Sequence, residues 1–148
     1  MRTRTLAREA ALQYLYEVDV VGLEEAEAVD AFLERQLGRA EAREYAGQLI
    51  LGALDRLADI DETLARCSEN WALDRMAIVD RNVLRLGAYE LLYGKDVPHK
   101  VAINEAINLS RRFSTEESCA FVNGILDRIR EIAPRGTADA EPREPSDA

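Results

Sequence analysis

The chain has 148 residues, of which 47% are hydrophobic and 32% charged, and its formal net charge is −9. This length and composition are typical of one globular domain with a sizeable core. Its apolar runs fall well short of the roughly 18 residues that a membrane-spanning helix needs. No apolar stretch follows the first arginines as it does in a signal peptide. We therefore expect a cytoplasmic protein that makes no membrane contact.

Positive charge gathers in two regions of this acidic chain. Arg2, Arg4 and Arg8 precede the first acidic residue, Glu9, and the segment 95–112 holds four bases against two acids. On a helix, Arg4 and Arg8 lie one turn apart, and cations near a helix N-terminus oppose the helix dipole. Stability alone gives no reason for this placement, whereas an anionic partner such as RNA does. Solvated arginines at a frayed helix end are the alternative.

Apolar residues recur at spacings of three and four along most of the chain, which predicts helices. No stretch alternates with the period of two that is typical of a strand. We predict helices over 3–20, 24–37, 40–57, from 59 or 61 to 67, over 75–93, and two more between 96 and 133. The helix over 75–93 is apolar on more than one side, which predicts a central helix, and Glu90 within it needs a partner. The pattern therefore predicts an all-α domain, a compact bundle of about seven helices over residues 1–133.

The composition changes after Ala133. The last fifteen residues carry three of the four prolines and no large apolar side chain. Such a segment buries too little apolar surface to offset the entropy of ordering it. We predict a disordered acidic tail over residues 134–148.

Motifs of common catalytic and cofactor sites are missing. The chain contains no glycine-rich phosphate loop and no GxSxG turn. A structural zinc site needs about four ligands, but His99 is the single histidine, and Cys67 and Cys119 lie far apart. We expect buried free thiols, no metal, no cofactor and no enzymatic activity.

The segment from Asp96 to Asp127 reads as two helices joined by a short turn. Pro98 ends any preceding helix by fixing its own φ and disfavouring a helical residue before it. Ser114 followed three residues later by Glu117 predicts a capping box at the second start. Gly124 inside that helix costs about 1 kcal/mol against alanine, so we expect it at a close contact between helices.

This segment carries the most specific pattern in the chain. VPHKVAINEAINLSRRF followed by FVNGILD resembles the C-terminal signature of the NusB family of bacterial transcription antitermination factors. The usual signature is V-P-x-K-x-x-I-N-E-A-x-x-L, then a phenylalanine, then F-V-N-G-x-L-D. The stretches LAREAALQYLYEVD and VDRNVLRLGAYELLY are similar to the family as well, so the resemblance covers roughly residues 1–133. It implies a compact helical bundle made of two packed sub-bundles.

The resemblance also implies a function that is binding rather than catalysis. Members of the family bind single-stranded boxA RNA of ribosomal RNA leader transcripts together with NusE, a small-subunit ribosomal protein. The complex joins NusA, NusG and RNA polymerase and promotes reading through terminators. Carried onto this sequence, the RNA-binding residues are Arg2, Arg4, Arg8, Lys100, Glu117 and Phe121. The residues that face NusE are Tyr16 and Asp80, with Arg85 near them.

Alternatives stay open for several of these residues. Tyr16 and Phe121 are as well suited to packing between helices, and Lys100 and Arg85 to a solvated charge or a local ion pair. At the level of function, the alternative is a helical protein–protein adaptor with weak or no RNA binding. Some members of the family self-associate through the RNA-binding face, so a homodimer is a further alternative.

Overall fold

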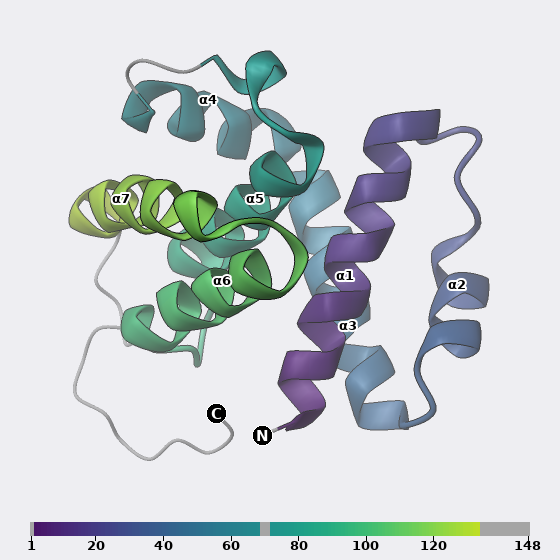
Figure 1. Cartoon of the computed structure of the whole chain (residues 1–148). Helices are drawn as coiled ribbons and strands as arrows, with labels where there is room; N and C mark the ends of the chain where they lie inside the picture. The colour runs from purple at the N-terminus through teal and green to yellow at the C-terminus, as the bar shows by residue number, and fades with distance from the viewer. Residues whose placement is uncertain (1, 69–71, 134–148) are drawn as a thin grey trace.

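The computed structural model describes residues 2–68 and 72–133, and both parts are helical (Figure 1). The α-helices are α1 (Arg2–Val21), α2 (Val29–Gln36), α3 (Ala40–Asp55), α4 (Leu57–Cys67), α5 (Ile78–Tyr93), α6 (His99–Phe113) and α7 (Glu116–Ile132). One 3₁₀ turn, η1 (Leu73–Arg75), precedes α5. Within these residues no strand occurs, which confirms the all-α prediction. The predicted tail over 134–148 and the side chain of Arg2 lie outside the described residues.

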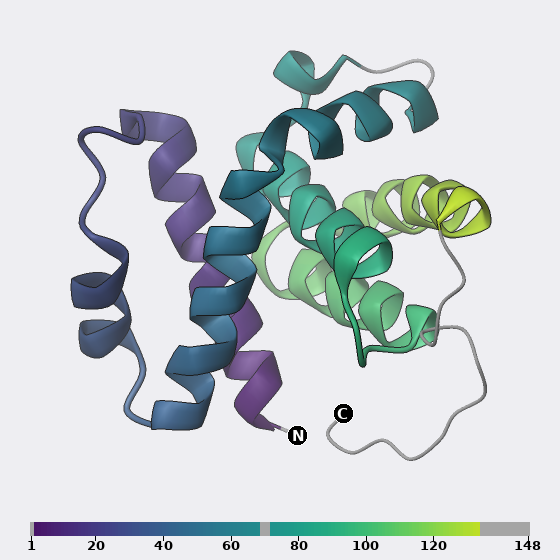
Figure 2. The ribbon, with the colours of Figure 1, turned by 180° about the vertical axis from the view of Figure 1, so that it is seen from behind.

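The helices form two groups that meet along α5. Helices α1, α2 and α3 pack on one another, and α4, α5, α6 and α7 form the second group. Figures 1 and 2 show the two groups side by side, with α1 and α3 facing the second group and α2 on the outside. Helix α5 packs against α1 and α3 as well as α4, α6 and α7, and it buries Val83, Leu84 and Leu86. The predictions of two sub-bundles and of a central helix are confirmed.

Proline and glycine set the boundaries around α6 as the sequence predicts. Gly94 is the C-cap of α5, and Pro98 is the N-cap of α6 with φ −60° and ψ 146°. Val97 between them is buried.

None of the helices in the two described ranges is long and apolar enough to cross a membrane.

Helix α4 begins at Leu57, earlier than the predicted residue 59 or 61, and two other helices begin several residues later than predicted. Helix α2 begins at Val29 rather than near residue 24, because Gly22 turns the chain with φ +93° and the residues after it form a turn. Helix α5 begins at Ile78 rather than at residue 75, since residues 73–75 form the separate 3₁₀ turn η1. In both places the apolar spacing already begins before the first helical residue, so periodicity alone predicts a start that is too early.

The predicted capping box at the start of α7 is wrong by one residue. Thr115 is the N-cap, and its hydroxyl oxygen accepts a hydrogen bond of 3.1 Å from the backbone N–H of Ser118. The Ser114 hydroxyl instead donates to the Asp80 carboxylate at 2.7 Å. The side chain of Ser114, which the local pattern assigns to the cap, is therefore engaged by Asp80 of another helix.

The predicted close contact at Gly124 is also wrong. A Cβ atom added at Gly124 has no neighbouring atom within 4 Å. The close approaches between helices occur at two other glycines: an added Cβ would lie 2.7 Å from Leu126 Cδ1 at Gly87, and it would overlap the Tyr89 hydroxyl oxygen at Gly52. These two glycines let α7 and the Tyr89 ring, respectively, approach the neighbouring backbone.

Candidate nucleic-acid and partner interface

Arg8, predicted to contact RNA, is buried and fully engaged inside the protein. Its side chain lies between α1 and α5, and only 4% of the residue is exposed. Its Nε and one terminal nitrogen donate to the two oxygens of Glu90 at 2.9 and 3.0 Å. The hydroxyl of Tyr45 also donates to Glu90, and Glu105 lies 3.5 Å from the guanidinium. The partner predicted for Glu90 is thus Arg8.

The electrostatics of this cluster favour a permanent charge pair. Burial by itself lowers the pKa of the Arg8 guanidinium, but the charge and hydrogen bonds of Glu90 outweigh burial and raise that pKa above its usual value. Burial, followed by the negative charge of Glu90, raises the pKa of the Tyr45 hydroxyl. The argument that the N-terminal arginines serve no structural purpose is therefore wrong for Arg8, because its charge is compensated in the interior.

Arg4 lies one turn earlier and is nearer to solvent. Its guanidinium carbon is 4.3 Å from the centre of the Tyr45 ring, and a terminal nitrogen is 3.5 Å from Asp96. About a quarter of its side chain, 24%, is exposed. Lys100, at the start of α6, is exposed. Among the described side chains of the N-terminal arm, Arg4 is thus the arginine that reaches the surface.

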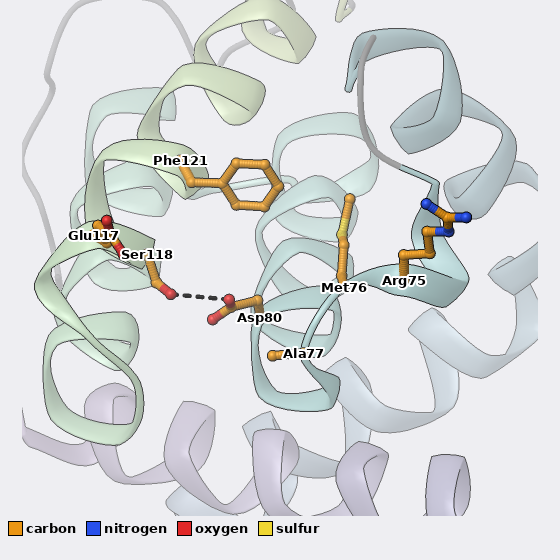
Figure 3. Close-up of a pocket in the computed structure, with 7 residues that line it drawn as sticks. All are labelled: Arg75, Met76, Ala77, Asp80, Glu117, Ser118 and Phe121. Atoms are coloured by element: carbon orange, nitrogen blue, oxygen red, sulfur yellow. Dashed lines mark hydrogen bonds between the residues drawn. The ribbon is translucent and has the colours of Figure 1, made fainter.

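Glu117 and Phe121 line an open pocket of about 410 Å³ where α7 faces α5 and η1 (Figure 3). The other lining residues are Arg75, Met76, Ala77, Asp80 and Ser118. Glu117 is exposed and the Phe121 ring is half-buried, so the ring is neither a core side chain nor a free surface group. Apolar walls and charged groups are here combined in one concave surface.

Asp80 forms part of the same pocket, although the sequence analysis assigns it to the partner rather than to RNA. Its carboxylate accepts hydrogen bonds from Ser114 at 2.7 Å and from Ser118 at 2.9 Å, and Figure 3 shows the second of these. Asp80 on α5 thereby fixes the first turn of α7, which carries Glu117 and Phe121. The structure brings these three predicted residues together, and the two predicted binding surfaces therefore adjoin.

Arg85 is held by ion pairs within the chain, which confirms the alternative of a local ion pair. It donates to both oxygens of Asp61 at 2.9 Å and to Asp19 at 3.0 Å. Arg81 binds the same Asp19 carboxylate through two bonds of 2.8 and 2.9 Å, and the Asn82 side-chain amide donates to it at 2.9 Å. The cluster joins α1, α4 and α5.

The cluster around Asp19 is not predicted by the sequence pattern. Hydrogen bonding from Arg81, against the opposing effect of burial, lowers the pKa of the Asp19 carboxyl below its usual value. Cations at 81 and 85 on one helix face are a signal that some carboxylate faces them. The periodicity of α5 does not say that this carboxylate comes from α1.

Tyr16, the other predicted partner residue, is 42% exposed on α1, three residues before Asp19. Val20, one turn further along, is 53% exposed, and Leu23 after the helix is 60% exposed. The alternative of packing in the core therefore does not hold for Tyr16. This end of α1 presents an apolar surface beside the Asp19 cluster.

The predictions for the cysteines agree with the structure. Cys67 and Cys119 are buried and free, and burial raises the pKa of the Cys67 thiol. In the described parts of the chain, no three histidine, cysteine or acidic side chains gather as a metal site would require.

Comparison with known proteins places this arrangement in context. The profile of the NusB family matches residues 5–131. The transcription antitermination protein NusB of Sorangium cellulosum is 47% identical over 139 residues, which is 94% of this chain and 99% of that protein. The structure of T. maritima NusB is 41% identical, covers 88% of this chain and 92% of that one, and superposes with a TM-score of 0.78.

A further similar structure contains binding partners. It is described as the antitermination factors NusB and NusE in complex with double-stranded RNA. The aligned chain is 29% identical to this one, the alignment covers 89% of this chain and 98% of that chain, and the TM-score is 0.77.

Proposed function

The chain belongs to the NusB family, and we propose that it is a transcription antitermination factor that binds boxA RNA together with NusE. Membership rests on the match over residues 5–131 and on close relatives of nearly the same length. In this function the protein is a binding component and catalyses no reaction. It works in the cytoplasm, where it joins NusA, NusG and RNA polymerase and promotes processive transcription.

The observation that carries the proposal is the pocket shared by Asp80, Glu117 and Phe121 (Figure 3). A half-buried aromatic ring at the edge of an open pocket is a stacking surface for an unpaired base, because every base has a π-face. Arg4 and Lys100 supply cations for phosphates, which hold the strand without reading its sequence. Glu117 beside the ring accepts hydrogen bonds from base edges and disfavours a phosphate at that place.

For NusE we propose the surface around Tyr16 and Asp80. Tyr16, Val20 and Leu23 present exposed apolar groups on and after α1, which suit a protein partner better than a polyanion. Asp80 forms the border between the two ligands, because it lines the RNA pocket and holds the first turn of α7.

Arg8 and Arg85 take a different role in this proposal. Both guanidinium groups are engaged by carboxylates of the same chain, so they position other residues rather than contact a ligand. Arg8 holds the arm against Tyr45, over which Arg4 lies, and Arg85 holds Asp19 beneath the Tyr16 surface. Arg2 stays a proposed phosphate contact.

The test is a gel shift with a boxA-like RNA and a scrambled RNA of the same length, each with and without NusE. We expect preferential binding of boxA that strengthens when NusE is present. Phe121→Ala should weaken boxA binding by about 1–3 kcal/mol, the loss of one stacked base, and leave NusE binding unchanged. Ile132→Ala, which trims an exposed apolar side chain at the other end of α7, is the matched control.

Two results would contradict the proposal. Binding of NusE without any effect on RNA would favour the adaptor, which the exposed apolar end of α1 also fits. Equal affinity for boxA and scrambled RNA, unchanged by Phe121→Ala, would leave only nonspecific electrostatic binding. A concentration-dependent dimer that RNA dissociates would not contradict the proposal, but it would show that the protein also self-associates through the RNA-binding face.

A further inference from the structure

The last turn of α6 holds two arginines, Arg111 and Arg112, which lie outside the pocket around Phe121. Their side chains are 56% and 61% exposed. Arg111 lies 3.6 Å from Glu116, an exposed acid in the first turn of α7. Arg112 lies 3.2 Å from Glu9 on α1, and its guanidinium carbon is 5.2 Å from the centre of the Phe113 ring.

These contacts place the arginine pair between the arm and the pocket. On one side, Arg112 reaches Glu9, which lies one turn beyond Thr5, and Thr5 in turn donates to Glu105 of α6 at 3.2 Å. On the other side, Arg111 reaches Glu116, the neighbour of Glu117 in the pocket. Figure 1 shows the turn between α6 and α7 reaching toward α1. A strand that spans from Arg4 to Phe121 along this face therefore passes the end of α6.

The distribution of charge also points to the two arginines at the end of α6. The chain carries a formal net charge of −9, so a polyanion needs local cations. The sequence suggests that the N-terminal arm provides them, but the structure buries Arg8 against Glu90. The described arm is left with Arg4, and the contacts with Glu9 and Glu116 place the two exposed arginines at the end of α6 between this arm and the pocket.

A contribution to folding stability does not account well for the presence of Arg111 and Arg112. Cations in the last turn favour the helix dipole, but the effect is screened at exposed positions. Exposed ion pairs such as those with Glu9 and Glu116 contribute little to folding. Two long side chains held at a junction of three helices suit the planar, bidentate recognition of phosphate that arginine provides.

We propose that Arg111 and Arg112 bind phosphates of the RNA segment that connects the arm with the Phe121 pocket. This inference rests on the proposed function, and it adds a binding element at the end of α6. Glu9 and Glu116 keep the two guanidinium groups oriented until the phosphates replace them as partners.

The experiment measures boxA RNA binding in the presence of NusE over a series of salt concentrations. For single strands each phosphate contact contributes about −0.7 to the slope of log K against log salt, so Arg111→Gln with Arg112→Gln should flatten the slope by about 1.4. Between about 50 and 200 mM salt, the wild type should then lose about sevenfold more affinity than the variant. Arg111→Lys with Arg112→Lys should restore most of the slope, because the charges return.

The matched control is Arg35→Gln with Arg66→Gln, which removes two exposed arginines from α2 and α4. It changes the net charge equally and should leave the slope within error of the wild type. A glutamine pair at 111 and 112 that behaves like this control would overturn the inference. Wild-type protein that fails to bind RNA at all would instead overturn the proposed function. Thermal melting of every variant shows that the helices stay folded.

Discussion

Arg8 and Glu90 lie 82 residues apart in the chain and meet in the interior through hydrogen bonds of 2.9 and 3.0 Å. This contact fixes the N-terminal half of α1 against the central helix. It also turns a residue that the sequence assigns to RNA into part of the core. The placement of the N-terminal arm therefore depends on this buried ion pair.

The first prediction concerns this pair. Arg8→Gln should lower the free energy of unfolding by about 3–5 kcal/mol, because it leaves the Glu90 carboxylate buried without its counter-charge. Arg4→Gln, one turn away, should cost less than about 1 kcal/mol, since that side chain is closer to solvent. Urea unfolding monitored by circular dichroism checks both. Equal losses in the two variants would contradict the structural role of Arg8.

The second prediction contrasts two glycines inside helices. Gly87→Val should destabilise the protein by about 1–3 kcal/mol, because a Cβ at this position meets Leu126 at 2.7 Å and the added methyl groups overpack the contact. Gly124→Ala should be neutral or stabilise by up to about 1 kcal/mol, since space is open there and alanine favours a helix. Melting temperatures compare the two variants. A loss at Gly124 as large as that at Gly87 would place a close contact where the structure has none.

The third prediction separates the hydrogen bonding of Asp80 within the chain from its proposed contact with NusE. Ser114→Ala removes one hydrogen bond to the carboxylate but keeps its charge, so it should cost about 1 kcal/mol of stability and leave NusE binding unchanged. Asp80→Asn keeps the shape but removes the charge, and it should weaken NusE binding if the carboxylate faces that partner. Calorimetric titration of NusE into each variant measures the difference. Equal NusE affinity for the wild type and Asp80→Asn would remove Asp80 from the interface.

The fourth prediction follows from the lowered pKa of Asp19. A carboxyl whose pKa is lower in the folded than in the unfolded state stabilises the fold when the pH is above its pKa in the unfolded chain, which is about 3.9 for Asp. This stabilisation is lost as the pH falls through the pKa of the folded state. Asp19→Asn should therefore reduce the free energy of unfolding at pH 7. The difference from the wild type should shrink as the pH falls below about 4. Chemical unfolding at several pH values tests this, and a difference that is constant with pH would contradict it.

Local patterns in the sequence were enough to predict that the chain is helical and that α5 is central. Apolar spacing is a property of neighbouring residues, and it shows that 75–93 is buried on several sides. It also shows that Glu90 needs a partner. It does not show that the partner is Arg8, because a helical pattern tells which face is buried and not which distant helix covers it.

The same limit explains the errors in the site. Ser114 and Thr115 are both good cap residues, and the choice of Thr115 depends on Asp80, which takes the Ser114 hydroxyl. Gly87 and Gly124 look alike in the sequence, and only the position of α7 distinguishes them. The resemblance to the family suggests Phe121 and Glu117 as site residues, but the pocket that they share with Asp80 depends on how α7 lies on α5.

The charged residues of α1 are synthesised well before their partners on α5, and this order has a consequence for folding. Arg8 and Asp19 are among the first residues synthesised, and their counter-charges Glu90, Arg81 and Arg85 all lie on α5. Domains generally fold as units, and synthesis delivers the N-terminal residues first. A nascent chain that ends before α5 can bring α1, α2 and α3 together, but it cannot bury Arg8 and Asp19 without leaving two charges uncompensated. The first three helices should therefore stay loosely packed on the ribosome until α5 has emerged.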